Sequence, residues 1–175
     1  MEFHGKKWMV FVTLIGLAVS GRLLAHQPNL TPMAAAVLFA GFFFESWYAA
    51  AAVGLISMSL SDLFLGGYEL PVMISVYASL IAPLLLRTWL RSKLSAGRVA
   101  VSAIASSLAF FLVTNFAVWA WGGWYGHTVN GLLACYAAGL AFLKYTAAGD
   151  LFWSTVLFGG YGVAARYVLP RKVLA

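Results

Sequence analysis

Few residues in this chain could do chemistry, and most fall in segments that would face one side of a helical membrane protein. Five are ionisable side chains at or near the ends of apolar runs: Arg22, Asp62, Glu69, Lys144 and Asp150. Ionisable groups are costly inside a bilayer, and they usually face a cavity or a partner of opposite charge. Two cations and three anions nearly balance, so these groups predict a roughly neutral polar cluster that could bind a small molecule.

Amide, imidazole and aromatic side chains extend this candidate site. The residues that we expect to contact a substrate are Arg22, Asn29, Asp62, Glu69, Asn115, Trp121, Trp124, Tyr125, His127 and Lys144. The polar members would hydrogen-bond the substrate, and the aromatic members would stack on it or cover it. Apolar walls with a few convergent polar groups are typical of small-molecule sites.

Most of these residues also have a structural interpretation. Tryptophan and tyrosine form belts at the membrane surface in many membrane proteins. Arg22 could reach the headgroups or pair with Asp62. Asp150 precedes an apolar run and is most simply a helix N-cap. Lys144 could anchor a helix at the interface, and Asn115 could join two helices by a hydrogen bond.

The composition places these groups in a membrane protein. Of the 175 residues, 63% are apolar and 9% are charged, and the mean hydropathy is +0.90. A soluble domain is nearer half apolar and a quarter charged, so a soluble enzyme, a disordered chain and a disulfide scaffold are excluded. Cys135 is the one cysteine, which leaves no internal disulfide and no cysteine-based metal site. We expect one integral membrane domain, residues 1–175, with no metal, no cofactor and no nucleic-acid partner.

The elements that must position the polar groups are apolar helices. The apolar runs cover residues 8–25, 33–44, 47–65, 71–90, 99–121, 129–143 and 151–169. A spanning helix needs about 20 residues, so 33–44 and 129–143 could be short spans, re-entrant pieces or interfacial helices. If 33–44 spans and 129–143 does not, six helices place nine of the eleven Lys and Arg residues inside. Counts of five or seven helices separate the Lys and Arg residues less well between the two sides. The five-helix count is only slightly worse than the six-helix count.

The six-helix count gives an all-α bundle with both termini in the cytoplasm. Pro83 lies inside the fourth run and should kink that helix. Small residues four apart let membrane helices approach closely. Such pairs, which could either pack the bundle or form a flat surface for a partner protein, are Gly16 with Ser20 and Ala36 with Ala40.

An enzyme is not expected. The chain has no G-x-x-x-x-G-K-[ST] phosphate loop, no G-x-S-x-G and no H-E-x-x-H. Two aspartates and three glutamates are too few for most metal-dependent lipid phosphotransfer sites.

Short motifs follow one another in a recognisable order. After the first apolar run come His26-Gln27-Pro28-Asn29, a short helix and a small-residue helix that ends Ser61-Asp62-Leu63-Phe64-Leu65-Gly66-Gly67. This order resembles the substrate-binding S components of energy-coupling factor (ECF) vitamin transporters, which often have an S/D-L-x-x-G ending to the third helix. Ala141-Phe142-Leu143-Lys144 resembles their P-F-N-x-x-K segment, without its Pro and Asn. Residues 119–125 resemble the Trp-rich outer loop of thiamine-specific members.

A second resemblance covers most of the chain. An uncharacterised bacterial family described as transport proteins is similar in three motifs: Pro28-Asn29-x-Thr31-Pro32, Ser61-Asp62-Leu63-Phe64 and Thr114-Asn115-x-x-x-Trp119. It brings no biochemistry with it.

The S-component resemblance implies a micronutrient bound under the outer loops of a six-helix bundle. It also implies a transmembrane coupling subunit with two cytoplasmic ATPases. The family's A-x-x-x-A contact motif on the first helix is replaced here by Gly16 and Ser20. We therefore expect a multi-pass protein of the bacterial inner membrane that binds and takes up a small vitamin-like solute. The alternative is a structural or assembly subunit of a larger membrane complex.

Overall fold

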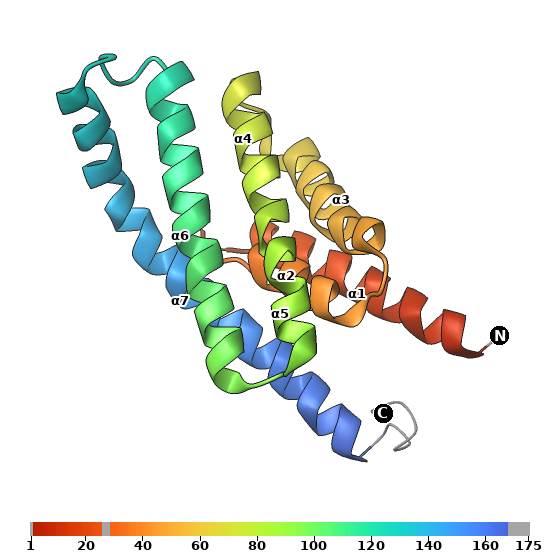
Figure 1. Cartoon of the computed structure of the whole chain (residues 1–175). Helices are drawn as coiled ribbons and strands as arrows, with labels where there is room; N and C mark the ends of the chain where they lie inside the picture. The colour runs from red at the N-terminus through yellow and green to blue at the C-terminus, as the bar shows by residue number, and fades with distance from the viewer. Residues whose placement is uncertain (1, 26–28, 168–175) are drawn as a thin grey trace.

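The protein is built from helices joined by short turns. The computed structural model describes residues 2–25 and 29–167. Their helices are α1 (Glu2–Leu23), α2 (Met33–Phe43), α3 (Trp47–Leu65), α4 (Leu70–Ile81), η1 (Ala82–Leu86), α5 (Arg87–Ser92), α6 (Ala96–Trp121) and α7 (Val129–Tyr167) (Figure 1). The motif residues His26, Gln27 and Pro28 and the end of the last apolar run lie outside the described residues.

Proline changes the helix type at the position where the sequence predicts a kink. α4, the 3₁₀ segment η1 and α5 follow one another without a break, and Pro83 stands in the first turn of η1. Proline has no N–H to give to the preceding turn, which favours the tighter segment at this point. When the three pieces count as one helix, the described chain is an all-helical bundle of six helices, and this part of the prediction is confirmed.

Four helical segments are long and apolar enough to cross a membrane: 47–65, 70–92, 96–121 and 129–166. α1 is not among them, and α2 has only 11 residues. The side of the membrane on which each terminus lies stays a prediction. Below, the end of the bundle with residues 66–69 and 122–128 is called outer, and the end with residues 44–46 and 93–95 is called inner.

The sequence interpretation of the last third of the chain was wrong. The runs 129–143 and 151–169, expected to be separate, belong to one continuous helix of 39 residues, α7. At 1.5 Å per residue this helix is about 58 Å long, nearly twice the hydrocarbon thickness. Its glycines do not end it, because Gly139 and Gly149 are points where other groups pack against the helix backbone.

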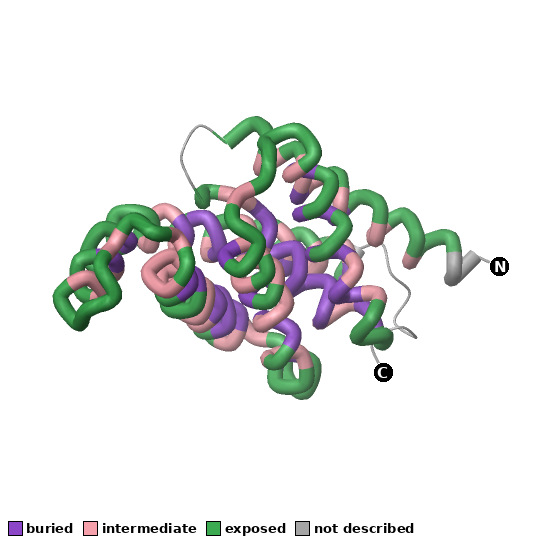
Figure 2. Tube along the Cα trace, turned by 90° about the horizontal axis from the view of Figure 1, so that it is seen from above, coloured by how far each residue is buried: buried purple, intermediate pink, exposed green. Residues whose placement is uncertain are grey.

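The short helix α2 forms the centre of the bundle. Eight of its eleven residues are buried, and it packs against α1, α3, α6 and α7. Figure 2 shows the buried segments gathered in the middle of the molecule and the exposed ones along its outside. Ala36 and Ala40 are completely buried here, so the predicted partner surface on this helix is wrong. Their small side chains instead let the neighbouring helices approach.

The surface is apolar, and much of the polar content is inside. Large apolar side chains such as Leu63, Phe64 and Leu85 are at least three-quarters exposed. An exposed apolar surface of this extent fits a bilayer and not water. The buried polar residues are Ser57, Ser61, Ser79, Ser102, Ser106, Ser107, Thr114, Thr146, Asp150 and Ser154.

Arginines close the inner end of the bundle. Arg87 and Arg91 donate hydrogen bonds to the carbonyl of Phe44, just after α2 ends, at 3.3 Å each. Arg98 donates to the carbonyl of Trp89, in α5, at 2.6 Å. Carbonyls at the end of a helix lack intrahelical donors, and cations near them are favourable. This basic run, Arg87 to Arg98, therefore has a structural role besides its share in the excess of Lys and Arg predicted inside the membrane.

A glycine replacement tests this packing. A Cβ at Gly54 of α3 would lie 2.7 Å from Cγ2 of the fully buried Val37 on α2, whereas one at Gly160 of α7 would meet nothing within 4 Å. We expect Gly54→Ala to lower the free energy of unfolding by about 1–3 kcal/mol, because overpacking moves stiff side chains. Gly160→Ala is the matched control and should leave stability unchanged or slightly raised. Thermal unfolding in detergent measures both, and equal melting temperatures for the two variants would contradict the packing.

Candidate functional site

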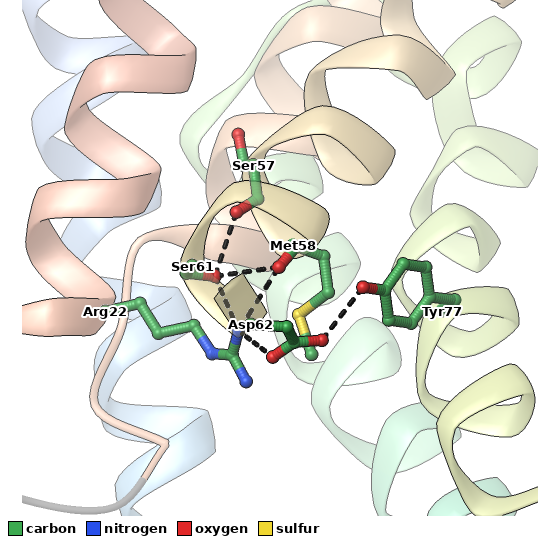
Figure 3. Close-up of polar contacts among 6 residues, drawn as sticks. All are labelled: Arg22, Ser57, Met58, Ser61, Asp62 and Tyr77. Carbon is green, nitrogen blue, oxygen red and sulfur yellow. Dashed lines mark hydrogen bonds and ion pairs between the residues drawn. The ribbon is translucent and has the colours of Figure 1, made fainter. Parts of the chain in front are cut away.

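An ion pair lies near the outer end of α1 and α3. Nη1 of Arg22 donates to Oδ1 of Asp62 at 2.6 Å, to the hydroxyl of Ser61, and to the Met58 carbonyl at 3.5 Å (Figure 3). The two side chains are 18% and 10% exposed. Serine at position 61 is one helical turn from Ser57, whose carbonyl accepts its hydroxyl at 2.9 Å. The predicted pairing of Arg22 with Asp62 is confirmed, and it holds the end of α1 against α3.

Two tyrosines complete this cluster. Tyr77 of α4 donates to Oδ2 of Asp62 at 2.8 Å, so each carboxylate oxygen has a partner from a different helix (Figure 3). Tyr68 lies in the turn between α3 and α4. Burial raises the pKa of its phenol to about 12, and the negative charge of Asp62 adds to this rise while Arg22 opposes it.

A cavity of about 310 Å³ opens beside the ion pair, and we call it the Arg22 cavity. Its lining comes from α1, the loop before α2, and α2, α3, α4 and α6: Arg22, Ala25, Asn29, Thr31, Met33, Met58, Leu65, Tyr68, Val76, Leu80 and Phe110. The hydrogen bonds that Arg22 makes to described residues all use Nη1. Its Nη2 and Nε groups can therefore donate to a ligand in the cavity.

A second cavity, of about 240 Å³, lies between the outer halves of α6 and α7, and we call it the Asn115 cavity. Its lining residues are Asn29, Phe110, Phe111, Thr114, Asn115, Val118, Tyr125, Cys135, Ala138, Gly139, Phe142, Leu143 and Thr146. The amide nitrogen of Asn115 donates to the Phe111 carbonyl at 2.8 Å. A Cβ at Gly139 would lie 2.2 Å from Oδ1 of Asn115, so this glycine makes room for the amide.

Asn29 and Phe110 line both cavities. Asn29 has φ +63°, a left-handed conformation that asparagine tolerates better than most residues. The loop that carries it rests on α7, because a Cβ at Gly149 would lie 3.1 Å from the Cα of Leu30. The loop therefore reaches the middle of α7, and the two cavities form adjoining lobes that meet at Asn29 and Phe110.

Part of the predicted site lies outside these cavities. Trp121 and Trp124 are 53% and 81% exposed, which fits the alternative interpretation of an aromatic belt. His127 is exposed and stands edge-to-face with Trp119 at 5.7 Å between ring centroids. Of the predicted aromatic contacts, Tyr125 alone lines a described cavity.

The predicted five-charge cluster does not form. Glu69 is exposed at the start of α4. Lys144 is exposed on α7, with its ammonium 4.8 Å from the ring centre of Tyr145, and it lines neither cavity. Asp150 is not an N-cap, because it lies near the middle of α7, where it is 3% exposed and contacts Ser107. The continuity of α7, which the sequence interpretation broke at residue 143, separates these groups.

Sequence reasoning also missed several lining residues. Phe110, Phe111 and Phe142 lie on apolar helices, where the sequence does not distinguish a cavity face from a lipid face. Tyr77 could have been suspected, since a phenol 15 residues after an aspartate can return to it on the next helix. Within residues 2–25 and 29–167, no three His, Cys, Asp or Glu side chains gather in a way that could hold a metal ion.

The Asp62 cluster makes a prediction about stability. Asp62→Ala leaves the largely buried guanidinium of Arg22 without its acid, and removing the partner of a buried charged group costs roughly 1–3 kcal/mol or more. Tyr77→Phe removes one hydrogen bond and should cost less, about 0.5–1.5 kcal/mol. Thermal unfolding of both variants tests this order. A larger loss of stability in Tyr77→Phe than in Asp62→Ala would contradict the prediction.

The same cluster predicts a change in the titration of Tyr68. Asp62→Asn removes the negative charge that raises the pKa of this phenol and leaves Arg22, which lowers it, unopposed. Losing the Asp62 charge and leaving Arg22 unopposed both lower the pKa of Tyr68, so it should fall from about 12 toward its ordinary value of 10. Tyrosine-labelled NMR follows the titration, with Tyr68→Phe to assign the signal. An unchanged or higher pKa in Asp62→Asn would contradict the geometry.

The comparisons with known proteins identify a family and no relative of known function. Neither the curated proteins nor the solved structures that were compared include a match to this chain. A family described as "Family of unknown function (DUF6580)" matches residues 3–172, which is nearly the whole chain. Because the match covers nearly the whole chain, the protein belongs to the DUF6580 family.

Proposed function

We propose that this protein binds a small organic solute in the Arg22 and Asn115 cavities and takes it up across the bacterial inner membrane, in the manner of an S component. The observation that carries the proposal is the pair of adjoining cavities at the outer half of the bundle. Each combines apolar walls with a few polar groups, which is the usual composition of a small-molecule site.

The cavities follow from the shortness of α2. Eleven residues make a helix about 16 Å long, roughly half the hydrocarbon thickness. α2 fills the inner half of the bundle centre, where Gly41 meets Leu84 and Arg87. Above Met33, at the start of α2, the centre is occupied by the loop of Asn29 and Thr31 and by the Arg22 cavity. A full-length helix here would leave no space for a solute.

The lining indicates the chemistry of the solute. Arg22 can donate to an oxygen or nitrogen acceptor, but Asp62 balances its charge, so the site does not call for a strongly anionic solute. The Asn115 amide offers an acceptor and a donor in the other lobe. Between them the side chain of Phe110 offers an apolar surface. These features favour an uncharged or weakly charged solute of vitamin size with polar groups at two ends.

Energy for uptake would come from a partner. An S-component-like protein would work with a transmembrane coupling subunit and two cytoplasmic ATPases. Gly16 and Ser20 are exposed on α1, one turn apart, and the Ser20 hydroxyl donates to the Gly16 carbonyl at 2.6 Å. This leaves a small, flat face on α1 that suits close helix packing. With Ala36 and Ala40 inside the core, the proposed partner surface lies on α1 alone.

A cavity-filling variant tests the solute site. Phe110→Trp adds volume where the two lobes meet, so it should reduce solute binding at least tenfold without removing a polar group. Phe116→Trp is the matched control, because Phe116 lies on the same helix with its side chain 46% exposed. Mass spectrometry of small molecules that co-purify with each variant, followed by binding measurements with a vitamin panel, gives the comparison.

The control should retain the co-purified molecule that Phe110→Trp loses. No co-purified small molecule from the wild-type protein, together with no binding across the panel, would overturn the proposal. Equal retention by Phe110→Trp would place the solute elsewhere.

A further inference from the structure

Asp150 is a buried carboxyl that the proposed solute site does not use. Its side chain lies near the middle of α7, is 3% exposed and contacts Ser107 of α6. Neither the Arg22 cavity nor the Asn115 cavity includes it. An ionisable side chain inside a membrane bundle is expensive and usually has a function.

No cation balances this carboxyl within the described part of the chain. α2 and residues 29–31, which pack on α7, contain no ionisable side chain. On α6 the one charged residue is Arg98, which donates to the carbonyls of Trp89 in α5 and of Lys93 just after it. On α7 itself, Lys144 is exposed and lies over Tyr145, and Arg166 is exposed in the last turn of the helix. An ionised Asp150 would therefore be a buried charge with one hydroxyl as its partner.

The two contacts of the Ser107 hydroxyl can both be hydrogen bonds only if Asp150 carries a proton. Oγ of Ser107 lies 2.6 Å from Oδ2 of Asp150 and 3.1 Å from the Ala103 carbonyl oxygen. A hydroxyl has one hydrogen, so Ser107 can donate to only one of these two oxygens. If the carboxyl is protonated, it donates to Oγ of Ser107, and Ser107 donates to Ala103. Both short contacts are then hydrogen bonds.

A cavity at the inner end of the bundle provides a route by which a proton can reach Asp150. Ser154 follows Asp150 by one helical turn and lines a cavity of about 320 Å³ between the start of α6 and α7. Ser154 is 1% exposed, and its buried hydroxyl has no hydrogen-bond partner among residues 2–25 and 29–167. Most of the lining is apolar, but Ser95 and Thr155 line the cavity together with Ser154. Water held by these hydroxyls would give the Ser154 hydroxyl a partner and lead toward Asp150.

We propose that Asp150 is a proton-binding site inside the membrane bundle, which takes up a proton from water in the inner cavity and holds it against Ser107. The reaction is the addition of one proton to the carboxylate, which becomes a neutral carboxylic acid. The proposal does not depend on solute binding, because it rests on the α6–α7 contact and not on the outer cavities.

Infrared spectroscopy of the full-length protein in lipid tests this site without any solute. At neutral pH the wild-type protein should show the carbonyl stretching band of a protonated carboxylic acid, and Asp150→Asn should lose it. Asp62→Asn is the matched control and should keep the band, because Asp62 is ion-paired with Arg22. Ser107→Ala should shift the band, because the protonated acid loses its acceptor.

The outcomes separate this proposal from the proposed function. A wild-type protein without the band at neutral pH, or a band that survives in Asp150→Asn, would overturn the proton site. If Asp150→Asn does not fold, an unshifted band in Ser107→Ala would overturn it equally. A failed search for a solute would overturn the uptake proposal and leave the proton site standing.

Discussion

The length of α2 is the constraint on which the rest of the structure depends. A membrane interior offers no water, so the centre of a bundle must be filled by protein or lined as a cavity. With only 11 residues, α2 fills the inner half and brings its buried face against α1, α3 and α7. Residues 29–31, just before α2, lie against the middle of α7 at Gly149. The outer half of the centre is left to polar groups and cavities.

Polar side chains in this bundle fall into three separate groups with different roles. Asp62 bonds both Arg22 and Tyr77 and so holds α1, α3 and α4 together at the outer end. Arginines of the basic run close the inner end by bonding carbonyls at helix ends. Between these ends, Asp150 and Ser107 join α6 and α7. The charged side chains of these three groups, Arg22, Asp62, Arg87, Arg91, Arg98 and Asp150, each make a specific contact.

Sequence reasoning succeeded where a local signal was strong. Hydropathy indicated the helical membrane bundle, Pro83 marked the point where the α-helix gives way to a 3₁₀ segment, and opposite charges near two helix ends indicated the Arg22–Asp62 pair. It failed on α7, because glycines at 131 and 139 and two charged residues imitate a loop. The groups that those glycines admit are the Gly126 backbone at Gly131 and the Asn115 side chain at Gly139. Single-sequence patterns do not contain these contacts, so Lys144 and Asp150 were assigned to the wrong environment.

The central claim is that the outer half of the bundle holds a solute. Its most direct test is an experimental structure, at a resolution that shows small molecules, of the protein purified in lipid from its native membrane. A bound solute should give density for one compact molecule that spans the two lobes past Phe110 and contacts Arg22 and the Asn115 amide. Lobes closed by side chains, or filled only by lipid tails entering from the side, would contradict it.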